Sequence, residues 1–280
     1  MTRRQYLLMA ACAVDGLLVL DPRPSLPQPV FRYLCVIDIT QSMNTPDYHQ
    51  AGWPNDRLGY VKAALRASLA ELPCGSELAL GVFTSHITQL LFKPLEVCAH
   101  GGVMDEVIAH LDWRMAWAAN SQIDQGVATA LHRIREDDPN LRLVFFTDGQ
   151  TAPGEPRLPD FSTDRGKIKG MLVGVGSSEP SLVPRYDQEN RFLGYFLKTD
   201  LGIQDAAGGD MYYRSWLDEP HLRTLALASG LDYHRLYTVD GLTALLTHPS
   251  GFEYRSLPLD VRPWMASLAM LLLLCAVLLA

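Results

Sequence analysis

The feature that most constrains the fold is a short apolar run that ends in alternating oxygen-bearing side chains. Residues 33–37 read Tyr-Leu-Cys-Val-Ile, and Asp38, Thr40 and Ser42 follow at every second position. A run without a polar face is typical of a central strand in a parallel sheet, which is buried on both sides. Three alternating oxygens after such a strand can point at one spot, and oxygen ligands suit a hard divalent cation such as Mg2+.

Two further apolar runs have the same character, and helical patterns separate them. Residues 141–146 lead into Thr147-Asp148-Gly149, and residues 171–175 form another run. Apolar residues at helical spacing predict helices near 57–72, 103–111, 121–135, 218–229 and 239–247. This alternation predicts an α/β fold with a doubly wound, mostly parallel sheet of Rossmann-like type. We expect six strands, with an antiparallel edge strand from a hairpin that turns at 84–86.

The ends of two strands carry a candidate metal site. Ligands of open α/β sheets bind beyond the carboxyl ends of the strands, where Asp38 and Asp148 stand, and Ser121 lies in a loop that can reach the same edge. Each residue alone would be explained as a turn or helix cap. Together they predict a site of two carboxylates and three hydroxyls: Asp38, Thr40, Ser42, Ser121 and Asp148. Because Mg2+ takes about six ligands, one position is left for water or for a partner's carboxylate.

These polar segments resemble the metal-ion-dependent adhesion site of von Willebrand factor type A domains. That family has the pattern D-x-S-x-S, a Thr in a second loop and an Asp in a T-D-G-type turn. The resemblance covers about residues 30–247 and implies the same metal ligands for Mg2+, or for another divalent cation such as Ca2+ or Mn2+. Thr40 stands where the family has its first Ser, and Ser121 where it has Thr, and both keep a hydroxyl.

An apolar segment lies at each end of the chain. Residues 264–280 contain no charge, so we expect a transmembrane helix there, at the short end of the required length. Residues 1–20 begin with Arg3 and Arg4, and Asp15 interrupts their apolar stretch. An uncleaved anchor, a signal peptide and a buried helix all fit this segment.

The remaining chain divides into linkers and one domain. We expect a Pro-rich linker at 21–29, a type A domain at 30–248 and a second linker at 249–263. Within the domain, residues at about 184–214 read as an insertion that contains an exposed β-hairpin around Gln188-Glu189-Asn190.

The charged ends and the cysteines bear on the compartment. If residues 1–20 span a membrane, Arg3 and Arg4 keep the N-terminus in the cytoplasm, and the domain lies in a bacterial periplasm. If only the last segment spans, Arg262 favours a cytoplasmic domain. Cys74 and Cys98 flank the hairpin and can face each other across it. A disulfide there would favour the oxidising side of the inner membrane, while two free thiols are the alternative.

The order of segments resembles a narrower group. A hydrophobic start, a Pro-rich linker, a type A domain and a C-terminal helix resemble the bacterial membrane-anchored type A proteins encoded with MoxR-type ATPases. Residues 183–196 and 230–236 resemble accessory proteins of methanol dehydrogenase gene clusters. That resemblance implies other membrane type A proteins and a MoxR-type ATPase as partners. It also implies a role in maturing a periplasmic quinoprotein, such as calcium insertion.

The function predicted from the sequence is a membrane-anchored, metal-dependent protein-binding module that assists assembly or maturation of a partner. The net charge of -7 does not suggest a nucleic-acid partner. An enzyme is not expected, because the chain lacks a G-x-S-x-G elbow, a P-loop and an H-E-x-x-H motif. A metal-dependent hydrolase or phosphatase that uses Asp38, and a structural type A domain with a vacant metal site, are the alternatives.

Overall fold

The computed structural model describes residues 2–20, 22–118, 120–152, 158–201 and 211–278. The chain forms two compact units, which are described separately. One unit comprises Val30–Phe252, and the other combines Met1–Pro29 with Glu253–Ala280.

A six-stranded sheet forms the centre of the Val30–Phe252 unit, with the order β11-β6-β5-β2-β3-β4. Its strands are β2 (Arg32–Asp38), β3 (Glu77–Thr84), β4 (Ile87–Glu96), β5 (Arg142–Thr147), β6 (Gly170–Gly174) and β11 (Asp232–Arg235). All neighbouring strands are parallel except β3 and β4, which pair antiparallel. The predicted mostly parallel sheet with one antiparallel edge strand is confirmed.

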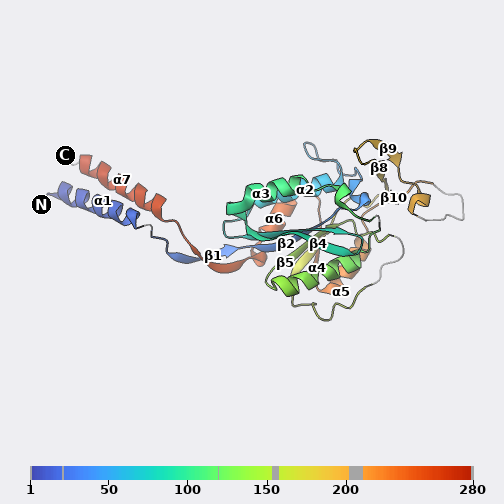
Figure 1. Ribbon diagram of the computed structural model, residues 1–280. Coiled ribbons are helices and arrows are strands. Elements are labelled where there is room, and N and C mark those ends of the chain that lie inside the picture. Colours follow the sequence, from blue (N-terminus) through green and yellow to red (C-terminus); the bar gives the residue numbers. More distant parts are fainter. Residues whose placement is uncertain (1, 21, 119, 153–157, 202–210, 279–280) are drawn as a thin grey trace. The chain divides into compact units, whose positions relative to one another are not determined.

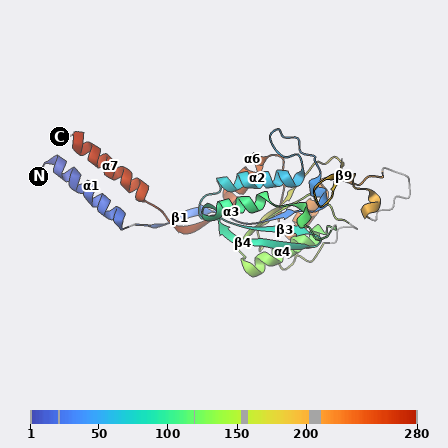
Figure 2. The ribbon, with the colours of Figure 1, turned by 45° about the horizontal axis from the view of Figure 1, so that its top comes forward.

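Helices cover both faces of this sheet (Figures 1 and 2). They are α2 (Arg57–Glu71), α3 (Val97–Ala109) and α6 (Val239–Leu246) on one face, and α4 (Ile123–Asp137) and α5 (Glu219–Ser229) on the other. Every residue of β2 is buried, with Cys35 and Ile37 in the core under α2, and Leu34 and Val36 in the core under α4. The strand is therefore apolar on both sides because each side meets a helical layer.

One helix begins earlier than its apolar pattern predicted. The sequence indicated a helix near 103–111, whereas α3 begins at Val97. The Glu96 side chain caps it by accepting a hydrogen bond from the backbone N–H of Ala99. This early start places Cys98 beside Cys74, and the structure contains the disulfide between them, with a Cα–Cα distance of 5.2 Å.

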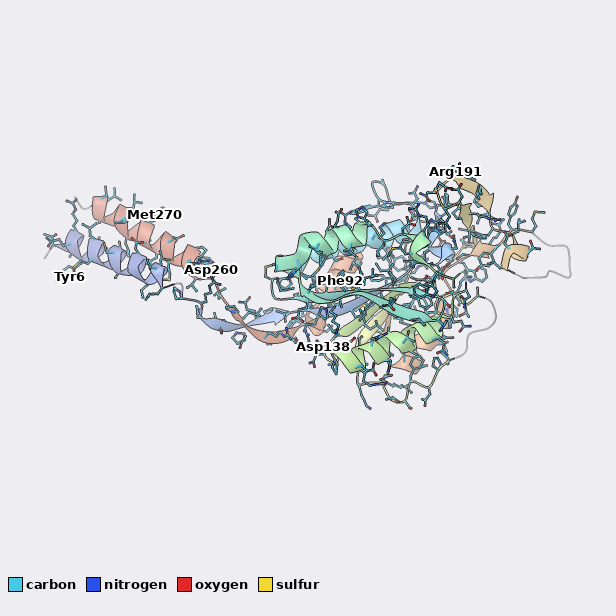
Figure 3. The ribbon with its side chains drawn as sticks, viewed as in Figure 1. Tyr6, Phe92, Asp138, Arg191, Asp260 and Met270 are labelled. Atoms are coloured by element: carbon cyan, nitrogen blue, oxygen red, sulfur yellow. A yellow bond between two sulfur atoms is a disulfide. The ribbon has the colours of Figure 1, made fainter. Side chains whose placement is uncertain are left out.

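An insertion lies between β6 and α5. It contains β7 (Ser181–Leu182), β8 (Pro184–Tyr186), β9 (Phe192–Tyr195) and β10 (Arg214–Ser215). Strands β8 and β9 form the predicted hairpin, with Arg191 at its turn (Figure 3). Strand β7 pairs antiparallel with β10. Residues 202–210 of the predicted insertion lie outside the described residues.

The second unit contains two helices and a two-stranded sheet. Its elements are α1 (Arg3–Val19), β1 (Ser25–Val30), β12 (Glu253–Pro258) and α7 (Arg262–Leu278). Helix α1 packs against α7, and β1 pairs with β12. The segments predicted as linkers, 21–29 and 249–263, therefore each contain most of a paired strand. Prolines are tolerated in such a strand because each strand of a pair has an unpaired edge.

Within the part of the chain that the structure describes, no helix is long and apolar enough to cross a membrane. The transmembrane helix predicted at 264–280 and the membrane anchor predicted at 1–20 are therefore not supported. Helices α1 and α7 have 17 residues each. That length corresponds to about 26 Å of helix, against a hydrocarbon core of about 30 Å.

Candidate metal centre

Asp38, the last residue of β2, has a fully buried carboxylate. Its Oδ1 accepts hydrogen bonds from the backbone N–H of Thr40 (2.9 Å) and from the Thr40 hydroxyl (2.7 Å). Its Oδ2 accepts one from the Thr147 hydroxyl at 2.7 Å. Burial and the nearby Asp148 carboxylate raise the pKa of Asp38 to about 7, against the opposing effect of these donors. The negative charge of Asp38 therefore lacks a full counter-charge from the protein.

The chain beyond Asp38 brings the next two hydroxyls together. Thr40 is extended, and a 3-10 helix at Gln41–Asn44 turns the backbone after it. The Thr40 hydroxyl lies within hydrogen-bond distance of the Ser42 hydroxyl, at 3.3 Å. The alternating oxygens of Asp38, Thr40 and Ser42 thus form a connected group, as the spacing in the sequence indicated.

Ser121 comes from the loop before α4, and its backbone is fixed by pairing with Ala152. The Ser121 N–H donates to the Ala152 carbonyl (2.6 Å), and the Ala152 N–H donates to the Ser121 carbonyl (2.9 Å). The buried Oγ of Ser121 has no hydrogen-bond partner among the described residues. Together with Thr40, Ser42 and Gln150, Ser121 lines a cavity of about 130 Å³.

Asp148 follows the end of β5 and is also buried. Its Oδ1 accepts from the backbone N–H of Gln150 at 3.0 Å. Its Oδ2 accepts from the Arg57 guanidinium (2.8 Å) and from the Ser215 hydroxyl (3.1 Å). The structure thus gathers three of the five predicted site residues around one cavity, and it places the two carboxylates in the buried network beside them.

Arg57 is a residue of this network that the sequence interpretation missed. It is the first residue of α2, and its side chain is fully buried. Its guanidinium pairs with Asp47 (2.6 Å) and Asp148 (2.8 Å) and also donates to Ser215 (2.6 Å). Gly176 makes room for it, because a Cβ there would clash with the guanidinium. A helical pattern could not reveal this arrangement, since an arginine at a helix start normally faces water.

Formal charge in this network favours a cation. Three carboxylates of the network are 3% exposed or less: Asp38, Asp47 and Asp148. The Arg57 guanidinium pairs with the last two. With all three carboxylates ionised, one guanidinium leaves two negative charges in a dry environment, which is costly unless a cation compensates them or Asp38 takes up a proton.

A second buried pair, Asp124 and His221, joins α4, α5 and the turn after β5. Nε2 of His221 lies 2.8 Å from Asp124 Oδ1, and Nδ1 lies 2.6 Å from the Gly149 carbonyl oxygen. Both partners are acceptors, so both ring nitrogens donate and the ring is an imidazolium. Burial lowers the pKa of His221, but the hydrogen bonds to Asp124 and Gly149 outweigh it and raise the pKa above its ordinary value. The sequence interpretation missed this pair, because neither residue stands in a recognisable spacing.

The residues present fit a hard divalent cation. All candidate ligands are oxygens, two buried negative charges need compensation, and the Ser121 hydroxyl is buried without a partner among the described residues. Mg2+, Ca2+ and Mn2+ prefer this chemistry over sites built from nitrogen and sulfur.

No family model matches this sequence. Among solved structures, the chain is similar to the conserved hypothetical protein BatB from Bacteroides thetaiotaomicron, at 15% identity and a TM-score of 0.57. That match covers 78% of this chain and 96% of the other. An aerotolerance-related membrane protein from Bacteroides fragilis matches at 15% identity over 76% of this chain and 95% of the other, with a TM-score of 0.57.

A von Willebrand factor type A protein from Catenulispora acidiphila is also similar, at 12% identity over 89% of this chain and 50% of the other. Its TM-score is 0.46. At these identities the likenesses concern the fold and not the chemistry of the site. Together with the observed strand order, the two Bacteroides matches support an α/β fold like that of von Willebrand factor type A domains.

Proposed function

We propose that this protein is a metal-dependent protein-binding module and not an enzyme. Asp38, Thr40, Ser42, Ser121 and Asp148 would hold a divalent cation, and a carboxylate from a partner protein would complete its ligands. The observation that carries this proposal is the unpartnered hydroxyl of Ser121. It lines the same cavity as the hydroxyls of Thr40 and Ser42, beside two buried carboxylates.

The neighbouring residues position this ligand set. Thr40 and Thr147 donate to opposite oxygens of Asp38 and so orient its carboxylate. Arg57 holds Asp148 through a direct ion pair. When bound, a divalent cation would supply the positive charge that attracts a carboxylate. Because the protein compensates only part of the buried negative charge, a cation of charge two matches what remains.

The alternative of a hydrolase with Asp38 as nucleophile is less compatible with this geometry. Both oxygens of Asp38 accept hydrogen bonds from threonines. The carboxylate is fully buried and is not among the groups that line the cavity. A nucleophile must approach the reacting atom directly, whereas a carboxylate can hold a cation through a bridging water. This favours binding over chemistry at Asp38.

A structural domain without metal is the other candidate, and Arg57 is the observation in its favour. Its guanidinium already supplies a positive charge next to Asp148. If Arg57 compensates the site sufficiently, the domain would need no cation. The two candidates differ in whether a cation binds and stabilises the folded protein.

We further propose that the module associates with a bacterial inner membrane and works on its periplasmic side. The similar protein from Bacteroides fragilis is described as a membrane protein. Helices α1 and α7 expose large apolar side chains, including Trp264 and Leu271, and the Cys74–Cys98 disulfide fits an oxidising compartment. In line with the resemblance of its segments, we propose a role in maturing a partner, such as calcium insertion into a methanol dehydrogenase. Other membrane type A proteins and a MoxR-type ATPase would take part.

Isothermal titration of the purified protein with Mg2+, Mn2+ and Ca2+ tests the central proposal. Wild-type protein is expected to bind at one site, and Asp38→Ala and Ser121→Ala to weaken or abolish binding. Ser25→Ala, at an exposed serine of β1, serves as the control and should bind normally. Absence of saturable cation binding to the wild type would favour the structural domain. Phosphatase activity that disappears in Asp38→Asn would favour the hydrolase.

A further inference from the structure

The cavity at the metal centre has two chemically different halves. One half consists of the hydroxyl-bearing residues already described, and the other is apolar. Val183, Phe196 and Tyr213 from the insertion form most of the apolar half, and Ala152 and Leu201 add to it. Such a pairing of polar and apolar surfaces is typical of a site that recognises two different groups of one ligand.

Backbone hydrogen bonds build this apolar wall. The Phe196 N–H donates to the Val183 carbonyl (3.0 Å), and the Tyr213 N–H donates to the Phe196 carbonyl (2.8 Å). Three extended segments of the insertion therefore lie side by side, with these residues as neighbours across them. Figure 1 shows β8, β9 and β10 gathered at one end of the sheet.

The wall is fixed to the metal centre through Ser215, two residues after Tyr213. The Ser215 hydroxyl contacts both the Asp148 carboxylate (3.1 Å) and the Arg57 guanidinium (2.6 Å). Ser215 is itself fully buried. The distance between the wall and the ligand hydroxyls is thus set by a buried ionic network and not by a loose loop.

The size of the cavity limits what can enter it. Its volume of about 130 Å³ is close to the roughly 150 Å³ of an apolar cavity that binds benzene. A space of this size limits the apolar group that can enter beside the ligand hydroxyls to one side chain no larger than Leu, Ile, Met or Phe. Ser42, Phe196 and Leu201 are partly exposed, so the cavity reaches the surface.

Exposed aromatic residues beside the wall point to a protein partner. Phe192, Tyr195 and Tyr212 form a row with ring-centroid distances of 5.3 and 6.3 Å, and each is more than a third exposed. Tyr195 and Tyr212 directly precede the wall residues Phe196 and Tyr213. Aromatic side chains are enriched at protein interfaces, where they bury large areas at low entropic cost.

We infer that the partner presents an acidic residue with a large apolar side chain within two positions of it. The carboxylate would bind the cation at the hydroxyl half of the cavity, and the apolar side chain would enter the half formed by Val183, Phe196 and Tyr213. This inference rests on the proposed function and adds to it the chemistry by which the partner segment is recognised. Two positions is the limit because both halves belong to one small cavity, and alternate residues of an extended segment face the same way.

Selection from a phage-displayed peptide library with a fixed central Asp tests this inference. The immobilised full chain is used at saturating Mg2+. Enriched peptides are expected to carry Leu, Ile, Met or Phe within two positions of the Asp. In a synthetic copy of an enriched peptide, replacing that residue with Ala should weaken binding about 10- to 100-fold. Replacing the Asp with Asn, or removing Mg2+, should abolish binding.

Variants of the cavity make the test specific. Ala152→Leu fills the cavity and should remove the preference for the apolar residue. Phe196→Ala enlarges the cavity and should shift the preference toward larger side chains. Ala99→Leu adds the same side chain at an exposed position of α3 and serves as the control. The melting temperature of each variant verifies folding.

The outcomes separate this inference from the proposed function. Peptides that require Asp and Mg2+ but show no apolar preference would overturn the inference and leave the metal-dependent binding function standing. An apolar preference that both cavity variants leave unchanged would also overturn it. Binding that survives EDTA, or no enrichment of any peptide, would overturn the proposed function together with the inference.

Discussion

The two ends of strand β2 each hold a cluster of charged side chains, and the clusters differ in burial. At the start of the strand, Arg32 pairs with Glu77 and with Asp138, which follows α4 (Figure 3). Those two carboxylates are 23% and 24% exposed, so water screens their charge. At the end of the strand, Asp38 and the Arg57 network are cut off from solvent. Excess negative charge is therefore screened by water at one end of the strand and is buried without such screening at the other.

This difference shows how a ligand site can be distinguished from a structural ion cluster. An ion pair near water costs little to maintain, and its removal has a modest effect. A buried cluster with excess charge is destabilising unless a further ion binds. The carboxyl end of the strand is also where ligands of parallel sheets bind. Changes in the charge at each end should therefore have very different consequences.

Removal of the buried guanidinium should produce the largest effect. In Arg57→Met the side chain keeps its approximate volume, but the carboxylates of Asp47 and Asp148 lose their counter-charge. We expect the free energy of unfolding to fall by about 3–5 kcal/mol, measured by urea denaturation. Arg32→Met is the matched control: its guanidinium is also buried, but water can solvate the carboxylates that it leaves behind, so a smaller loss of about 1–2 kcal/mol is expected. Equal losses in both variants would contradict the comparison.

Addition of a divalent cation should stabilise the folded protein through the carboxyl end of β2, where the buried negative charge is in excess. At a Mg2+ concentration about 100 times the Kd, wild-type protein should gain about 2.7 kcal/mol in unfolding free energy. Asp38→Asn should gain nothing from Mg2+. In EDTA at neutral pH, this variant should be at least as stable as the wild type, because burial raises the pKa of Asp38 and makes its charge unfavourable. Denaturation curves with and without Mg2+ check both statements.

The imidazolium of His221 should make stability depend on pH. Its pKa is raised in the folded protein, so its contribution is complete below the unfolded-state pKa of about 6.5. That contribution is lost as the pH rises through the folded-state pKa. His221→Gln should lower the unfolding free energy by about 1.5–3 kcal/mol at the acidic end of this range and show a flatter pH profile. Urea midpoints across the range test this.

The control for that measurement is His86→Gln, since His86 is exposed at the turn of the hairpin. Its profile should follow that of the wild type. If His221→Gln retained the full pH dependence, the assignment of the imidazolium to this position would be wrong.

The smallest effect should come from an ion pair that is wholly at the surface. Arg66 and Asp105 bridge α2 and α3, and their side chains are 43% and 42% exposed. Arg66→Met should lower the unfolding free energy by less than about 1 kcal/mol, and salt should weaken even that contribution. Thermal denaturation at low and high salt measures the difference. A loss as large as that of Arg57→Met would contradict the expected relation between the burial of an ion pair and the stability lost when it is removed.

Much of the site could be predicted because its signals are local. Asp38, Thr40 and Ser42 stand at alternate positions after an apolar run, and the chain needs only one turn to bring them together. The hairpin that places Cys74 opposite Cys98 is local as well. Ser121 and Asp148 could be added because parallel strands and the loops between them meet at one edge.

The residues that were missed depend on distant parts of the chain. Arg57 and Asp148 are 91 residues apart, and Asp124 and His221 are 97 apart. Their spacing carries no periodic signal, and charged side chains are normally expected at the surface. The pairing of β1 with β12 joins opposite ends of the chain and was hidden for the same reason.

The sequence by itself determined the order of strands and helices and the oxygen-bearing side chains at the ends of two strands. It did so because apolar periodicity and alternation report local structure directly. Only the tertiary structure decided which charges are buried, which hydroxyls lack a partner among the described residues and where the insertion places its apolar wall. These properties depend on which segments cover one another, and burial is what turns an ordinary ion pair into a cluster whose excess charge favours a cation.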